Sequence, residues 1–159
     1  MIIYRFAHPK FAGDLSGTGA RLRGGRWNPR GVPVTYTSQH ISLALLEILA
    51  NTGTLDELQT IHLVEIDVPD TIPIHEIKTA ALKKNWYSDV DYTQWMGQEI
   101  LRSNKYLLIK CPSAIVHNEH NYLINPLHPD FKKIHVKEAA EFYFDSRLFK
   151  QNNTSVSQK

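Results

Sequence analysis

The chain has 159 residues, enough for one domain, and its 42% apolar and 21% charged residues are typical of a globular protein that needs no disulfide or metal to build a core. The 18 basic and 16 acidic residues give a net charge of +2, which argues against nucleic-acid binding by bulk charge. A single cysteine and the lack of any apolar run near the roughly 20 residues that span a bilayer predict a cytoplasmic location without membrane contact.

The first part of the chain predicts two short strands separated by a long irregular segment. Residues 2–6 form an apolar strand, and residues 9–31 are rich in Gly, Pro and Ser without periodicity. Within that segment, residues 24–31 combine glycines that permit close backbone approach with an arginine suited to phosphate. Residues 32–37 alternate as a strand does. The residues on one face of this strand are Val32, Val34 and Tyr36.

A helix follows over residues 41–50, and we expect Ser38 to cap it. The helix is apolar nearly all round, so it should be buried. Its only charge is Glu47, and a buried carboxylate is costly unless it is paired or hydrogen-bonded. Two interpretations of Glu47 stay open: a structural ion pair with Arg5 or Arg147, or a functional group.

The second part of the chain predicts further short strands and one more helix. The expected strands cover residues 61–68, 106–110, 114–116, 122–124, 134–136 and 142–144. The expected helix covers residues 92–103 and is capped by Asp91. Many short strands with few helices are typical of an α+β fold. We expect a single domain over residues 1–150 and a disordered polar tail over residues 151–159.

Several common site chemistries find little support. His117 and His120 are spaced like a helical metal pair, but their segment is not helical, so we expect loop histidines and no metal. Cys111 follows an apolar strand, where a cysteine is more often a small buried hydrophobe than a nucleophile. Neither Gly-rich phosphate-loop motif occurs, and Ser113 lacks the elbow of a serine hydrolase.

Six segments, in order, resemble the RES domain, a family named for an arginine, a glutamate and a serine. These segments are GRWN (25–28), GVPVTY (31–36), LALLE (43–47), PSAIV (112–116), EHNYLINPLHPD (119–130) and FDSRL (144–148). The resemblance implies a fold similar to ADP-ribosyltransferases, with a split β-sheet and a few flanking helices. It also implies the toxin of a type II toxin–antitoxin system, an NAD+ glycohydrolase that hydrolyses the nicotinamide–ribose bond and depletes cellular NAD+.

The resemblance further implies the partners and site residues. The partner is an Xre-type helix-turn-helix antitoxin that blocks the active site and binds DNA, so the toxin forms a hetero-oligomer and has no direct contact with nucleic acid; a toxin dimer stays open. The implied catalytic residues are Arg26, Tyr36 and Glu47. The expected NAD+ contacts are Arg26, Trp27, Tyr36, Ser113 and Asn125. By residue type alone, Trp27 is more typical of a packed aromatic and Asn125 of a turn.

The chemistry of NAD+ cleavage suits these residue types. Breaking the nicotinamide–ribose bond passes through an oxocarbenium-like state, and Glu47 would stabilise that charge and orient water. Arg26 would pair with the pyrophosphate or ribose, Tyr36 would stack on nicotinamide, and Ser113 would bind the cofactor or Glu47.

Two other functions stay open. One is a protein ADP-ribosyltransferase toxin that uses NAD+ as donor. The other is a non-catalytic RNA- or nucleotide-binding module that uses Trp27 and the arginines at positions 21, 23, 26 and 30. The balanced charge and the lack of a role for Glu47 count against this second alternative.

Overall fold

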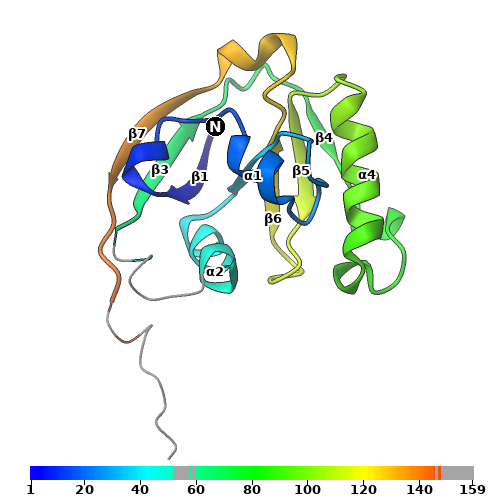
Figure 1. Ribbon diagram of the computed structural model, residues 1–159, viewed down its shortest axis with the longest axis horizontal. Helices are drawn as coiled ribbons and strands as arrows, with labels where there is room; N and C mark the ends of the chain where they lie inside the picture. Colours follow the sequence, from blue (N-terminus) through cyan, green and yellow to red (C-terminus); the bar gives the residue numbers. More distant parts are fainter. Residues whose placement is uncertain (52–57, 59, 146, 148–159) are drawn as a thin grey trace, which may run out of the picture.

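The computed structural model describes residues 1–51, 58, 60–145 and 147, so the expected tail over residues 151–159 lies outside the described residues. The described part is an α+β fold on one seven-stranded sheet in the order β4-β5-β6-β2-β1-β3-β7 (Figure 1). The strands are β1 (Ile2–Ala7), β2 (Thr35–Ser38), β3 (His62–Asp67), β4 (Ile74–Glu76), β5 (Leu108–Pro112), β6 (His120–Ile124) and β7 (His135–Glu141). The α-helices are α1 (Thr18–Arg23), α2 (Ile41–Asn51) and α4 (Val90–Arg102), and the 3-10 helices are η1 (Pro9–Phe11), η2 (Thr79–Ala81), η3 (Trp86–Ser88) and η4 (Pro129–Lys133). None of the described helices combines the length and apolar character that a bilayer crossing requires.

The sheet consists of two parts that meet at a narrow seam. Strands β4, β5, β6 and β2 form one part, and β1, β3 and β7 form the other. Across the seam, β1 and β2 share a single register pair, Tyr4 opposite Ser38, whereas β1 and β3 are paired along their whole length. Among the described strands, β4 and β5 form the one parallel pair. The predicted α+β fold with a split sheet is confirmed.

Two apolar cores lie on opposite faces of the sheet, because successive residues of a strand point to opposite sides. Leu108 and Ile124 belong to the core beneath residues 12–15 and η4. Their neighbours Ile109 and Leu123 belong to the second core, which α4 and the loop over residues 24–34 cover. Figure 1 shows α4 beside the β4–β5 side of the sheet. This second face carries the candidate site.

Two strand predictions are wrong. Residues 114–116 form a turn, because the Ser113 hydroxyl accepts hydrogen bonds from the Ile115 and Val116 amides and so holds the backbone in a bend. Residues 142–144 lie beyond the end of β7. Their aromatic side chains, a type common in strands, instead pack against Phe6. The ring centroids of Phe142 and Phe144 lie 5.0 and 5.6 Å from that of Phe6.

Both predicted helix caps are also wrong. Ser38 is the last residue of β2, and its hydroxyl lies 2.7 Å from Asn121 Oδ1 in the neighbouring strand. The cap of α4 is Asp89 rather than Asp91, because the Asp89 carboxylate accepts a hydrogen bond of 2.9 Å from the Tyr92 amide. Each predicted cap lies within three residues of the helix start, but the Ser38 hydroxyl is bound to Asn121 and the Tyr92 amide to Asp89.

Two helices differ from their predictions. Residues 18–23, expected to be irregular, form the short helix α1, which begins after Gly17 at φ +68° and ends at Gly24 at φ +77°. Helix α2 is less buried than its apolar sequence predicts: only Leu43 and Ala44 are buried, and Leu46 is 43% exposed. It packs over β1 and β2 with one face rather than entering a core.

Helix α4 packs directly onto the loop that carries Arg26. A Cβ atom at Gly97 would lie 1.9 Å from the carbonyl oxygen of Trp27, so the helix and the loop touch through their backbones. One turn earlier, Gln94 Nε2 donates a hydrogen bond of 2.8 Å to the carbonyl of Gly25. The position of this loop therefore depends on α4.

Replacing Gly97 with alanine should destabilise the protein, although alanine favours helix more than glycine does. The added methyl group has to displace the Trp27 backbone, and overpacking of this kind costs about 1–3 kcal/mol. The measurement is the free energy of unfolding in denaturant. Gly13→Ala is the matched control, because a Cβ there meets nothing within 4 Å. Equal stability of the two variants would contradict the predicted contact.

Candidate active site

Glu47 is fixed by groups from the β5–β6 hairpin. Its Oε1 accepts a hydrogen bond of 2.8 Å from Ser113 Oγ and another from Asn121 Nδ2, so the expected contact with Ser113 is present. The alternative ion pair with Arg5 or Arg147 is wrong. Arg5 donates to carbonyl groups in the loop after β1, and Arg147 pairs with a neighbouring aspartate.

Both donors to Glu47 are themselves oriented. Ser113 Oγ accepts from two backbone amides in the following turn, at 3.0 and 3.1 Å, so its proton is free to point at the carboxylate. Asn121 Oδ1 is bound to Ser38 Oγ, which leaves the Nδ2 group facing Glu47. Glu47 Oε1 is therefore held firmly, whereas its Oε2 accepts no hydrogen bond from any described residue.

Ser38 and Asn121 are site residues that sequence reasoning missed. They lie opposite each other in the β2–β6 ladder, on the same face as Tyr36 and Leu123. Each is a polar residue at a strand position where the neighbours on that face are apolar or aromatic. That departure from the pattern was visible in the sequence, but its meaning depended on the register of two distant strands.

Tyr36 organises the loop over residues 24–32. Its hydroxyl accepts a hydrogen bond of 2.8 Å from the Trp27 amide and donates one of 2.7 Å to Asn28 Oδ1. Gly25 lies so close that a Cβ there would come within 2.7 Å of the hydroxyl, which only glycine avoids. Burial raises the pKa of Tyr36, so the phenol stays neutral. It supports the loop as a neutral hydrogen-bonding group.

Arg26 lies beside Tyr36 with part of its guanidinium unpaired. Its positive charge acts to lower the pKa of Tyr36, against the larger effect of burial, which places the two groups in one neighbourhood. The Nη1 atom is excluded from solvent and has no hydrogen-bond partner among the described residues. A buried donor without an acceptor is costly. This loop therefore offers a cationic donor that an anionic ligand oxygen would satisfy.

Cys111 is a buried thiol near both Tyr36 and Glu47. It is fully buried and shares a register pair with Asn121, as expected for a small hydrophobe in the core. Burial and then the charge of Glu47 raise the pKa of the thiol, and Cys111 in turn acts on Tyr36. Tyr36 and Glu47 therefore both lie near this buried thiol, and Arg26 lies beside Tyr36.

Trp27 and Asn125 both make contacts with other residues of the fold. The Trp27 side chain is 2% exposed and packs against Trp86, with ring centroids 5.7 Å apart. Asn125 follows the end of β6 that lies away from Asn121, and its amide donates to the backbone of α4 while its Oδ1 accepts from the Leu127 amide. Both side chains serve the fold, and their contact with NAD+ stays a prediction.

The two histidines considered for metal binding belong to separate surroundings. His117 stacks on Tyr87, with ring centroids 4.6 Å apart. His120 lies in β6, where burial and then the charge of Lys110 lower its pKa. Within the part of the chain that the structure describes, no three His, Cys, Asp or Glu side chains are grouped to hold a metal ion.

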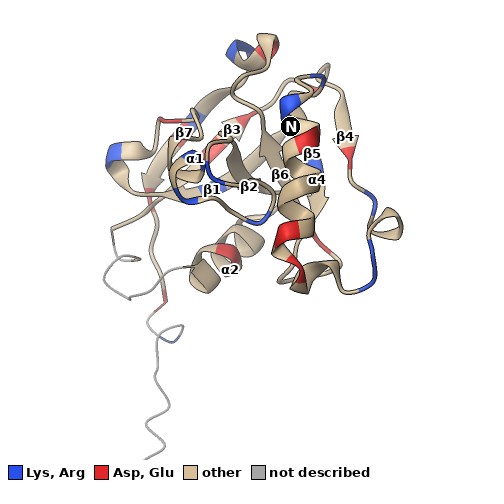
Figure 2. Ribbon diagram, turned by 45° about the vertical axis from the view of Figure 1, so that its right-hand side comes forward, with Lys and Arg blue, Asp and Glu red and all other residues tan. Residues whose placement is uncertain are grey.

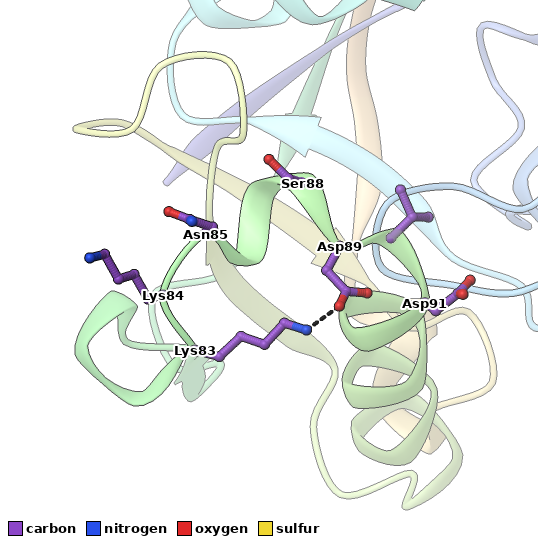
Figure 3. Close-up of a pocket in the computed structure, with 7 residues that line it drawn as sticks. Lys83, Lys84, Asn85, Ser88, Asp89 and Asp91 are labelled. Atoms are coloured by element: carbon purple, nitrogen blue, oxygen red, sulfur yellow. Dashed lines mark hydrogen bonds and ion pairs between the residues drawn. The ribbon is translucent and has the colours of Figure 1, made fainter.

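A hollow of about 460 Å³ lies before α4 and has a different lining from the groups around Glu47. The lining residues, drawn in Figure 3, are Lys83, Lys84, Asn85, Ser88, Asp89, Val90 and Asp91. Lys83 forms an ion pair with Asp89 across it, so two of its four charged side chains are paired within the protein. The candidate active site is instead the group around Glu47, whose carboxylate is held by two oriented donors.

Replacing Tyr36 with phenylalanine should lower the free energy of unfolding by about 1–3 kcal/mol, because the Trp27 amide and Asn28 Oδ1 both lose their partner. Tyr143→Phe is the control, since Tyr143 is 87% exposed. Denaturant unfolding monitored by circular dichroism gives both values. If the two variants are equally stable, the hydroxyl does not support the loop.

Known proteins similar to this chain agree with the resemblance found in its sequence. The family model described as the RES domain matches residues 2–145. "Toxin Res" of Photorhabdus laumondii is 39% identical over 94% of this chain and 98% of its own length. The "Prs ADP-ribosylating toxin" of Sphingobium sp. is 35% identical over 88% of this chain and 89% of its own length. The crystal structure of the M. tuberculosis MbcT–MbcA toxin–antitoxin complex contains a similar fold, with a TM-score of 0.72 and 20% identity over 89% of this chain and 83% of that chain. This chain belongs to the RES domain family.

Proposed function

We propose that this protein is the toxin of a type II toxin–antitoxin system and that it hydrolyses the nicotinamide–ribose bond of NAD+ in the cytoplasm. The observation that carries the proposal is the state of Glu47, whose Oε1 is fixed by two oriented donors while its Oε2 has no hydrogen-bond partner among the residues that the structure describes. The toxin role is supported by relatives that are 39% and 36% identical and named "Toxin Res".

The reaction that fits this arrangement breaks the bond between the nicotinamide nitrogen and ribose C1′. Nicotinamide leaves with the bonding electron pair and becomes neutral, so no general acid is needed, and positive charge develops on the ribose. Glu47 Oε2 would accept a hydrogen bond from a ribose hydroxyl and stabilise that charge. Water then forms the new bond to C1′ and releases its proton to solvent. Ser113 and Asn121 keep the carboxylate in place throughout.

Arg26 would hold the other end of the substrate. Its unpaired Nη1 matches an oxygen of the pyrophosphate. Tyr36 would form a wall of the site through its ring, because its hydroxyl is already bound to the loop. No metal takes part in this scheme.

A second candidate is transfer of ADP-ribose to a protein. It is supported by the relative named "Prs ADP-ribosylating toxin", which is 35% identical to this chain. The same bond breaks, and a side chain of the acceptor protein replaces water as the nucleophile. The two activities differ in product: free ADP-ribose from hydrolysis, and a protein heavier by one ADP-ribose from transfer.

We also propose an Xre-type antitoxin as the partner, in a hetero-oligomer in which the antitoxin alone contacts DNA. The support is the similar fold found in a toxin–antitoxin complex and the relatives named as toxins. Co-expression with the protein encoded by an adjacent small gene, followed by co-purification, tests this assignment.

Glu47→Gln should reduce nicotinamide release from NAD+ by about 10²–10³-fold, because it removes the charge that stabilises the transition state and keeps the size of the side chain. Chromatography of the products over time measures this rate. Glu138→Gln is the control, since Glu138 is exposed on β7. If wild-type protein releases no nicotinamide, alone or with candidate acceptor proteins, both NAD+ activities are refuted.

Arg26→Ala should mainly raise the KM for NAD+, because the guanidinium is proposed to bind the substrate rather than the reacting bond. Arg30→Ala is the matched control: Arg30 lies in the same loop and is exposed. Initial rates over a range of NAD+ concentrations separate KM from kcat. A KM equal to that of the control would remove Arg26 from the binding site.

A further inference from the structure

Glu119 is a second carboxylate on the face of the sheet that carries Glu47. It lies directly before β6, and its carbonyl accepts a hydrogen bond of 3.0 Å from the Ser113 amide. This bond extends the β5–β6 ladder by one pair, so Glu119 lies opposite Ser113. Because side chains alternate along a strand, Glu119 also shares a face with Asn121 two residues later. It therefore shares one face of the sheet with both donors that hold Glu47.

The Glu119 carboxylate is not satisfied by the protein. Its Oε2 is excluded from solvent without a hydrogen-bond partner, and Glu119 forms no salt bridge with any described residue. A buried carboxylate oxygen in this state has lost its hydration without compensation. Among the described residues, Arg26 Nη1 is the one other buried side-chain nitrogen or oxygen without a partner. These two atoms have opposite charge, and both belong to residues on the face of the sheet that carries Glu47.

A ligand that satisfies both atoms needs an anionic group for Arg26 and a positive charge for Glu119. NAD+ has both, since its pyrophosphate is anionic and its nicotinamide ring is cationic. We propose that Glu119 is a specificity-determining residue that recognises the positive charge of the nicotinamide ring; this inference rests on the proposed function. A carboxylate shielded from water attracts such a charge more strongly than an exposed one, because the local dielectric constant is lower. The reduced cofactor has a neutral ring and lacks this attraction.

Glu119→Gln tests the charge directly, because it keeps the size of the side chain and removes its charge. A merely structural carboxylate would lower the melting temperature when replaced. The proposal expects an unchanged or higher melting temperature, since a buried charge without a partner is removed. Glu138→Gln again serves as the control for a Glu→Gln change at an exposed position.

The binding experiment uses carba-NAD+, in which a methylene group replaces the ring oxygen of the nicotinamide ribose, so that no oxocarbenium ion forms and the ligand stays intact. Calorimetry on the full chain gives the Kd of carba-NAD+ and of its reduced form. Wild-type protein and Glu138→Gln should prefer the oxidised form. In Glu119→Gln this preference should fall roughly tenfold through weaker binding of the oxidised form alone.

The outcomes separate this inference from the proposed function. An unchanged preference in Glu119→Gln, or an equal loss of affinity for both forms with a lower melting temperature, overturns the role of Glu119. If this happens while wild-type protein releases nicotinamide from NAD+, the proposed function stands alone. A preference that depends on Glu119 in a protein that cleaves no NAD+ supports the inference and refutes the proposed activity. Failure of wild-type protein to bind either form overturns the role of Glu119, and failure to release nicotinamide as well overturns both.

Discussion

The hydrogen bonds to Glu47 Oε1 are the interaction on which the rest of this site depends. The carboxylate comes from a helix, and its two donors, Ser113 and Asn121, come from a hairpin more than sixty residues later in the chain. One oxygen ties these elements together, so the other is left in a fixed place with free acceptor capacity. A carboxylate held only by its own helix would keep the freedom of a long side chain. The protein thus prepares one negative charge in advance of any ligand.

The Arg26 side of the site is prepared in a different way, through neutral groups. The Tyr36 hydroxyl and the Asn28 amide both bind the backbone of the loop, and α4 lies directly against it at Gly97. These contacts give hydrogen-bond partners to backbone groups of an irregular segment that would otherwise be buried without them. Among the buried side-chain nitrogen and oxygen atoms of this loop, Arg26 Nη1 is the one without a partner in the described part of the chain. Rigidity of the loop and availability of the arginine are therefore consequences of the same packing.

Local sequence patterns predicted much of the fold and part of the site. Alternation identified the strand now seen as β3, and the apolar run from Ile41 identified α2, because both patterns are local. The Ser113–Glu47 contact followed from a family resemblance rather than from any local pattern. Asn121 was missed because its role depends on strand register, and residues 142–144 were misassigned because their aromatic side chains serve tertiary packing. Strand pairing and long-range packing cannot be predicted from any single segment of the sequence.

The narrow seam between β1 and β2 gives the hydrogen bonds of Glu47 a second, structural role. Helix α2 packs over β1 as well as β2, whereas Ser113 and Asn121 belong entirely to the other part of the sheet. The hydrogen bonds of this carboxylate therefore link two parts of the sheet that share a single register pair. The hydrogen bonds that position the carboxylate therefore also add to the cohesion of the sheet.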